Sequence, residues 1–405
     1  VVSRTPVPSP ATELWRRQMA LPQRLWQRLP LMDRWLTSEL LGPLLFGIAA
    51  FTAVSLSVGV VFELVRKVAE AGLPPLVAMQ VLGLRLPGFL VLSFPMATLM
   101  ATLLGYSRLS GSSELTALRS IGVSTRRMVV PALSVALLMT AITFVFNDVI
   151  VPSANLAASD TLDAALGRAI ASERGDNVVY SRFAEITVQE GSKQRSGRAL
   201  AQLFYARRFR EGEMQGVTLL DFSRPGQQQM LIAETAVWND ARSMWEFRNG
   251  RIVNITNADS RTTSADFDRY FYPFTSAPLD IGKLPSDAAQ MTVAQALRAE
   301  RLLQDAGDLK EARRLRVRIH EKFAFPAICL VFGLIGSSLG VRPNARTSRS
   351  QGFGISVLLI FGYYLMSFIF SSLGVKGTLL PFFSAWLPVF IGLAGGLYLL
   401  RQASR

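Results

Sequence analysis

The sequence has almost none of the residues that metal, redox and disulfide chemistry require. Among 405 residues it contains one cysteine, Cys329, and one histidine, His320. One cysteine cannot form a disulfide within the chain, and most zinc sites need clustered cysteine or histidine ligands. We therefore predict no metal, no cofactor and no redox role, and we expect Cys329 and His320 to be structural.

Charged residues are scarce as well. Only 18% of the residues are charged and 50% are hydrophobic, and the mean hydropathy is +0.30. In a typical soluble domain about a quarter of the residues are charged. The composition therefore excludes an ordinary soluble enzyme.

Six stretches contain no Asp, Glu, Lys or Arg at all. Each is about 20 residues long, which is the length of helix that crosses about 30 Å of hydrocarbon. The alternative, six buried helices of a soluble protein, would need far more polar chain around them. We therefore predict an integral membrane protein with six transmembrane helices. The stretches are residues 40–62, 86–107, 128–147, 323–341, 352–375 and 377–400.

The positive charge of the chain is concentrated in alternate connections. Lys and Arg exceed Asp and Glu by 14, and most of this excess lies in residues 1–38, 106–127, 341–351 and 401–405. Cytoplasmic loops of membrane proteins carry such an excess. We predict that both termini are cytoplasmic and that the long insert between spans three and four lies outside. The charge is thus explained by topology, and no nucleic-acid binding is expected.

The insert between spans three and four has a different pattern. Residues 177–274 alternate between apolar and polar in short segments, which predicts antiparallel strands. Asn249-Gly250 predicts a hairpin turn between two of them. We expect a β-sandwich or jelly roll of about a hundred residues, with helical connectors at residues 154–171 and 292–318. The expected strands are residues 178–188, 200–206, 217–222, 230–238, 244–247 and 251–255.

The connection between spans two and three contains a short helix signal. Ser112 or Ser113 can cap the helix, Glu114 suits its positive first turn, and Gly122 can end it in the left-handed conformation. The spacing predicts a helix across the cytoplasmic face that either docks into a partner protein or lies on lipid headgroups. Three residues spaced by three, Leu115, Leu118 and Ile121, are expected on one face.

Several motifs follow one another in a specific order. They are MDRWL at residues 32–36, FPMA at 94–97, SELTALRSIG at 113–122, HEKFAFP at 320–326, LIG at 334–336 and the pair Tyr363-Tyr364. Their order, together with three spans, a β-domain and three further spans, resembles the LptF/LptG (YjgP/YjgQ) family of lipopolysaccharide-export permeases. The resemblance extends from about residue 32 to residue 401.

The resemblance implies a permease subunit of an inner-membrane ABC exporter. Such a subunit passes lipopolysaccharide, or a similar anionic glycolipid, toward periplasmic bridge proteins. A second permease subunit, either an identical copy or a paralogue, and a dimer of a cytoplasmic ABC ATPase complete the exporter. The sequence has no GxxxxGK[ST] loop, so we expect ATP hydrolysis to be the partner's activity. The implied ATPase-docking residues are Glu114, Leu115, Leu118, Arg119 and Ile121.

Two sets of residues are expected to contact the lipid. Arg66 and Lys67 follow span one, where their charges could bind headgroup phosphates or act as ordinary interfacial anchors. Glu63, one turn earlier, weakens this expectation. In the resembling family a lateral gate lies between spans one and five. The gate and cavity residues implied here are Phe51, Ser55, Phe361 and Phe368, for which packing or lipid contact is the alternative role.

These observations divide the chain into four parts. They are a cytoplasmic extension (1–31), spans one to three with a docking helix at about 112–122 (32–153), a periplasmic β-jellyroll domain with helical connectors (154–318), and spans four to six (319–405). The expected function is lipid export, with an apolar interior of the β-domain shielding the acyl chains. The alternatives are a membrane-anchored β-domain that binds a periplasmic partner, and a membrane enzyme, for which the spans lack an acid-base set.

Overall fold

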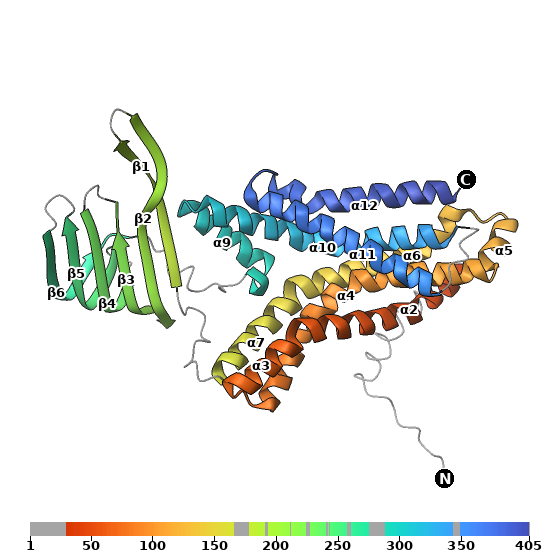
Figure 1. Ribbon diagram of the computed structural model, residues 1–405, viewed down its shortest axis with the longest axis horizontal. Coiled ribbons are helices and arrows are strands. Elements are labelled where there is room, and N and C mark those ends of the chain that lie inside the picture. The colour runs from red at the N-terminus through yellow and green to blue at the C-terminus, as the bar shows by residue number, and fades with distance from the viewer. Residues whose placement is uncertain are drawn as a thin grey trace, which may run out of the picture.

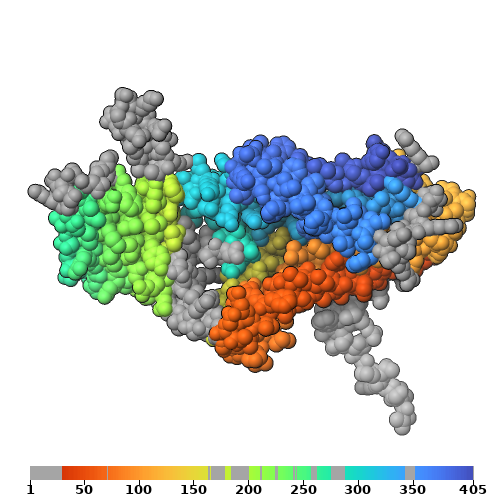
Figure 2. Space-filling model, viewed as in Figure 1, coloured from red at the N-terminus to blue at the C-terminus, as the bar shows by residue number. Residues whose placement is uncertain are grey.

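The protein has a helical bundle with a β-domain at one end (Figure 1). The computed structural model describes residues 30–165, 178–190, 193–210, 212–223, 227–239, 242, 244–256, 261–274, 288–342 and 349–404. Residues 1–29 of the expected cytoplasmic extension lie outside these residues. In the space-filling view, α2 to α4 and α10 to α12 line opposite sides of the bundle (Figure 2).

Within the described residues, six helices are long and apolar enough to cross a membrane, as the sequence predicts. Each charge-free stretch lies within one of them or extends just past its end. The first combines α2 (Leu31–Leu56), η1 (Ser57–Val61) and α3 (Phe62–Ala71), and the third combines α6 (Thr125–Val145), η2 (Phe146–Ile150) and α7 (Val151–Ala165). The others are α4 (Pro75–Gly111), α10 (Leu309–Gly340), α11 (Arg349–Lys376) and α12 (Pro381–Ala403).

The helices pack through small residues and expose large apolar ones. A Cβ atom added at Gly340 of α10 would lie 2.6 Å from Cβ of Tyr106 on α4, so the two backbones can approach only because the residue is glycine. By contrast, Phe46, Leu358 and Phe361 are largely exposed. Exposed apolar surface of this extent is expected where lipid or another protein covers it.

The helices of spans one to three are irregular at a common level. η1 and η2 are π-helical turns, and Pro87 lies inside α4. A Cβ atom added at Gly59 of η1 would lie 2.7 Å from Phe89, two residues beyond Pro87. π-helical turns and internal prolines are common causes of helix bends. In Figure 1, α3 and α7 accordingly leave the direction of α2 and α6.

The inserted β-domain contains six antiparallel strands, which confirms the sequence prediction of an antiparallel β-domain. In the described residues each strand pairs with the next, so the strands form a meander in one sheet rather than two packed sheets. The sheet is curled, as one contact shows. Tyr272 on β6 forms a hydrogen bond with Asp221 on β3, although two strands lie between them in the sheet. The strands are β1 (Val178–Glu190), β2 (Lys193–Arg210), β3 (Glu213–Asp221), β4 (Gln227–Asn239), β5 (Met244–Thr256) and β6 (Arg261–Tyr272).

The predicted hairpin at Asn249-Gly250 is wrong, because β5 runs straight through both residues. Asn249 adopts a positive φ of 50°, and its side chain donates a hydrogen bond to Glu234 on β4 at 3.2 Å. A Cβ atom at Gly250 would collide with Ile232 O and would lie 2.6 Å from Phe267. The Asn-Gly pair therefore permits close packing within a continuous strand, which is the other common use of such residues.

Helices connect the β-domain to the bundle. The expected connector at 154–171 is helical up to Ala165, where α7 ends, and residues 166–171 lie outside the described ones. The connector at 292–318 consists of α9 (Val293–Asp305), which begins with a capping box at Thr292, and the first turns of α10. Phe183 N of β1 donates to Ala306 O at 2.9 Å, so the end of α9 is bonded to the sheet.

Candidate functional site

The helix predicted between spans two and three is present at the end of the bundle that lies away from the β-domain (Figure 1). α5 (Glu114–Ser120) ends just before Gly122, which adopts the expected positive φ. Leu115 is 1% exposed and packs into the bundle core, and Leu118 is half-buried against the same core. α5 is therefore held to the bundle by its apolar side.

The three apolar residues of this segment do not share one face, contrary to the prediction. α5 ends at Ser120, so Ile121 no longer follows the helical repeat and its side chain is 75% exposed. Glu114 is exposed on the same segment and accepts a hydrogen bond from Ser112 Oγ at 2.7 Å. Of the expected docking residues, Glu114 and Ile121 are thus available to a partner, whereas Leu115 is internal.

Arg119 connects α5 to the end of span four. Its Nη2 atom donates to Val341 O at 2.7 Å, just after α10 ends. Ser110 Oγ, at the end of α4, donates to the next carbonyl, Arg342 O, at 2.9 Å. Two hydrogen bonds therefore join α5 and the end of α4 to the residues that follow α10. Sequence spacing gave no indication of this contact.

The two expected headgroup residues, Arg66 and Lys67, lie on α3 near the other end of the bundle. Lys67 Nζ lies 2.6 Å from Glu63, which also lies 3.7 Å from Arg85, so this carboxylate neutralises much of the local charge. Arg66 pairs more loosely with Glu70 at 3.6 Å, and both side chains are 71% exposed. Arg66 is the more available cation, and Glu63 has the weakening effect that the sequence predicts.

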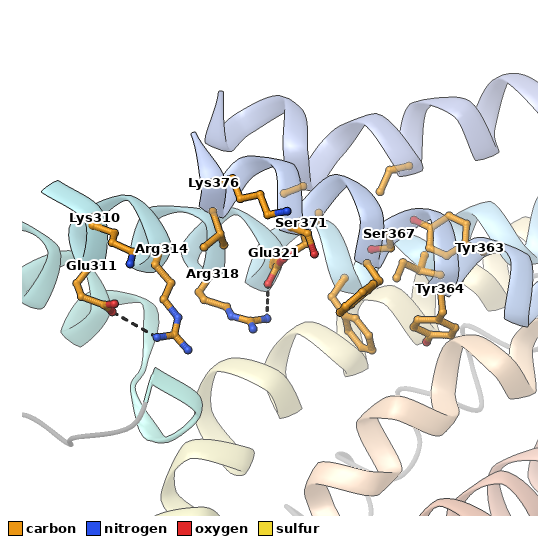
Figure 3. A pocket seen from close by; sticks show the side chains of 18 residues that line it. Lys310, Glu311, Arg314, Arg318, Glu321, Tyr363, Tyr364, Ser367, Ser371 and Lys376 are labelled. Atoms are coloured by element: carbon orange, nitrogen blue, oxygen red, sulfur yellow. Dashed lines mark hydrogen bonds and ion pairs between the residues drawn. The ribbon is translucent and has the colours of Figure 1, made fainter. Parts of the chain in front are cut away.

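A cavity of about 650 Å³ lies between α10, α11 and α12. One part is basic, with side chains from α10 and the end of α11, and the other is lined by aromatic and apolar groups (Figure 3). Such a division suits an amphiphile with an anionic headgroup. The cationic side chains are Lys310, Arg314, Arg318 and Lys376, the acidic ones Glu311 and Glu321, and the aromatic ones Phe325, Tyr363, Tyr364 and Phe368.

Sequence reasoning missed the basic part of the cavity. Lys310, Arg314 and Arg318 are spaced by four residues, which places them on one face of a helix. This spacing is the signal that could have found them. The spans were identified as stretches without charge, and these three charged residues precede such a stretch, so they were not considered as site residues. A lipid headgroup would nevertheless lie at that level.

The expected gate residues are only partly brought together. Phe368 lines the cavity, and Phe51 packs against the same buried cluster as Phe325 and Tyr364. Ser55 is half-buried on the same helix as Phe51. Phe361 is 64% exposed on the surface of α11. The structural roles expected of two other residues fit their surroundings, because Cys329 is fully buried and His320 packs edge to face on Phe382.

The inner side of the curled sheet is apolar and densely packed. Phe204, Trp245 and Phe247 are each 0% exposed, and the rings of Phe204 and Trp245 lie 5.0 Å apart. Leu219 is 1% exposed in the same cluster. The interior expected to shield acyl chains is thus filled by its own side chains here. A lipid could enter only if these side chains moved apart.

A polar cluster lies at one edge of this interior. Asp221 accepts hydrogen bonds from Tyr272 Oη and from Gln202 Nε2, the latter at 3.1 Å, and from Ser223 N at 2.7 Å. Burial alone would raise the pKa of Asp221, but the bonds from Ser223, Tyr272 and Gln202 outweigh burial and lower it. Burial, together with the adjacent carboxylate, raises the pKa of Tyr272. The cluster joins β2, β3 and β6.

The chain can be compared with known families. The model of one family, described as lipopolysaccharide export system permease LptF/LptG, matches residues 34–402. No curated protein matches the chain significantly. The matched residues include α5, α3 with Arg66, and the whole of the cavity between α10, α11 and α12.

Proposed function

Because the chain belongs to the LptF/LptG family of lipopolysaccharide export permeases, we propose that it is the permease subunit of an inner-membrane ABC exporter. In this proposal the subunit takes lipopolysaccharide, or a similar anionic glycolipid, from the membrane and passes it to periplasmic bridge proteins. A separate cytoplasmic ATPase dimer supplies the energy, and a second permease subunit, identical or paralogous, completes the passage. Both termini are cytoplasmic and the β-domain is periplasmic.

The position of α5 supports docking to the ATPase. α5 lies at the end of the bundle away from the β-domain, is anchored by Leu115, and leaves Glu114 and Ile121 exposed. An exposed carboxylate beside an apolar side chain is suited to a charged pair within a partially desolvated contact. The bond from Arg119 to Val341 O then connects the docked segment to α10.

The cavity is the observation that carries the proposed lipid specificity. Four cationic side chains border its outer part, and aromatic rings line its inner part. Arginine can bind phosphate through two parallel hydrogen bonds, and lysine acts as a point charge. Because α10 carries three of these cations and also the contact with Arg119, movement of α10 would act on lipid and motor together.

In this proposal the lipid passes from the membrane to the β-domain. Acyl chains that leave the membrane cost about 0.8 kcal/mol for each methylene exposed to water. The interior around Phe204 and Trp245 could offset this cost, provided that its packed rings separate as the lipid enters. We therefore propose that the packed interior is the state of the β-domain when no lipid is bound.

Site-specific photo-crosslinking in the reconstituted exporter tests this route. A photoreactive residue at Arg66 should capture lipopolysaccharide with or without ATP, whereas one at Leu219, inside the β-domain, should capture it only during ATP hydrolysis. Arg251 on the outer side of the sheet is 61% exposed and is the matched control, at which no lipid should be captured. Absence of lipid at Leu219 during turnover would exclude the β-domain from the route.

Co-purification with the ATPase distinguishes export from the alternative of a membrane-anchored binding domain. Glu114→Lys should reduce recovery of the ATPase by at least about tenfold, because reversing one partner of a desolvated pair costs about 2–5 kcal/mol. Arg251→Glu, a charge reversal on the β-domain, should leave recovery unchanged. If ATPase recovery is insensitive to Glu114→Lys, the proposed docking at α5 is wrong.

A further inference from the structure

One carboxylate in the cavity connects two spans. Glu321 of α10 accepts a hydrogen bond from Arg318 Nη1 at 2.8 Å and another from Ser371 Oγ of α11 at 2.5 Å. Figure 3 shows Glu321 between these two side chains, at the boundary between the basic and the aromatic parts of the cavity. Glu321 therefore holds the cation that lies deepest along α10 in the basic part.

The other acidic residue of the cavity is placed differently. Glu311 lies 3.5 Å from Arg314, and the two side chains are 46% and 58% exposed. Glu321 is only 25% exposed, and its distance to Arg318 is shorter. Exposed pairs contribute little, whereas a carboxylate shielded from water holds its partner more firmly. The two arginines are similarly exposed, Arg318 at 55% and Arg314 at 58%, so the pairs differ in how far the carboxylate is shielded. Only Glu321 has an interaction with α11 among those described.

A phosphate group that enters this cavity must compete with Glu321. Carboxylate and phosphate bind the same guanidinium donors with similar geometry, and the negative charge of Glu321 beside Arg318 repels a second anion there. The same competition assists release. When the phosphate leaves, Glu321 can pair with Arg318 again, so the guanidinium is not left without a partner, which would be costly.

We propose that Glu321 is an internal competitor that sets the affinity of the cavity for phosphorylated headgroups and promotes their release. In the empty cavity Arg318 then pairs with the carboxylate of Glu321, and in the loaded cavity it pairs with the phosphate of the lipid. This inference rests on the proposed function, because it takes a phosphorylated lipid as the ligand. It adds a residue whose role is to keep binding weak enough for transport.

Equilibrium binding of lipid A to the full chain in nanodiscs tests the proposal. The probes are bisphosphorylated lipid A and the same lipid without phosphates. Glu321→Gln keeps an oxygen for Ser371 but removes the competing charge, so it should bind the bisphosphorylated lipid about three- to tenfold more tightly, with no change for the other lipid. In the assembled exporter the same variant should release lipid more slowly.

Three variants serve as controls. Glu311→Gln, in the more exposed pair, should change the affinity by less than about twofold. Ser371→Ala removes the link to α11 but keeps the competitor, so it should also change the affinity little. In an Arg318→Gln background, Glu321→Gln should no longer tighten binding, since the contested cation is absent.

Glu321→Asp, a second and milder change, should tighten binding by less than Glu321→Gln.

The outcomes separate this proposal from the proposed function. Weaker binding by Glu321→Gln and Glu321→Asp, or a change no larger than that of Glu311→Gln, would overturn the role of Glu321 while leaving the lipid site intact. Equal binding of the two lipids by the unaltered chain would instead show that the cavity does not recognise phosphate, and the lipid site itself would fail.

Discussion

The two ends of the helical bundle are held together in different ways. At the α5 end, polar contacts join different helices. Asp33 of α2 forms two bonds with Arg127 of α6, at 2.7 and 2.8 Å, and Glu39 of α2 pairs with Arg108 of α4. The bond from Arg119 to Val341 O adds α10 to the same network.

At the end near the β-domain, most described charged pairs lie within a single helix. Examples are Lys67 with Glu63 on α3 and Arg314 with Glu311 on α10. Pairs of this kind stabilise a helix but do not hold it to its neighbours. The π-helical turns η1 and η2 are also on this side.

In the proposed exporter, this difference would meet two mechanical requirements. A segment that receives force from an ATPase transmits it only if it is firmly joined to the helices behind it. Helices that admit a lipid must separate, which is easier where most charged pairs lie within one helix, even though hydrogen bonds such as that from Ser371 to Glu321 also cross between spans there. We therefore expect substitutions at the α5 end to affect stability more than equivalent substitutions at the other end.

The largest effect is expected from filling the close contact near α5. Gly340→Leu places a side chain against Tyr106 Cβ and the backbone of Leu103, neither of which can move aside easily. Overpacking of this kind typically costs about 1–3 kcal/mol or more. Thermal unfolding in detergent should show a lower Tm. Gly362→Leu on α11 is the control, since no atom lies within 4 Å of an added Cβ there.

A smaller effect is expected from neutralising one acidic residue at each end. Asp33→Asn leaves Arg127 without its anion, and Asp33 is only 14% exposed, so a loss of about 1–2 kcal/mol is expected. Glu63→Gln should cost about 0.5 kcal/mol, because its nearest cation, Lys67, is on the same helix and Arg85 of α4 lies farther away at 3.7 Å. Chemical denaturation of both variants compares them directly. Equal losses would contradict the distinction between the two ends.

The smallest effect is expected from acid, which should loosen the β-domain. Hydrogen bonds lower the pKa of Asp221, so its carboxylate stabilises the folded domain above the ordinary pKa of about 4. This contribution is lost as the pH falls through the lowered pKa of the folded state. Because Asp221 is partly exposed, the loss should be about 1 kcal/mol or less.

Fluorine NMR of 5-fluorotryptophan at Trp245 measures this loss, since Trp245 lies in the same interior. The signal of the loosened domain should grow below about pH 4 in the unaltered chain. Asp221→Asn, which keeps an oxygen acceptor but cannot titrate, should flatten this dependence. Asp268→Asn, at an exposed carboxylate of β6, serves as the control and should behave like the unaltered chain.

The parts of the fold that depend on local composition were predictable. The six spans, the antiparallel β-domain and α5 all follow from runs of residues that are close in sequence. Asn249-Gly250 shows the limit of such reasoning. The pair is typical of hairpins, yet here it lies inside β5, because Phe267 and Ile232 on the neighbouring strands leave space only for glycine.

The candidate site was predicted less completely than the fold. Glu114 is exposed on α5 and Arg66 is exposed on α3, so both are accessible for the contacts proposed for them. Leu115 was misjudged, because spacing alone does not say whether an apolar residue faces its own bundle or a partner. The basic part of the cavity, including Arg318, was missed because its counterparts Ser371 and Lys376 lie on another span.

What the sequence by itself determined is which segments enter the membrane, since removing charge from about 20 consecutive residues is a local property. It also determined that a separate β-domain interrupts the spans. Only the tertiary structure decided which charges meet. Arg119 bonds to Val341 O and Glu321 bonds to Ser371 because folding brings distant residues within about 3 Å, the range in which a hydrogen bond forms.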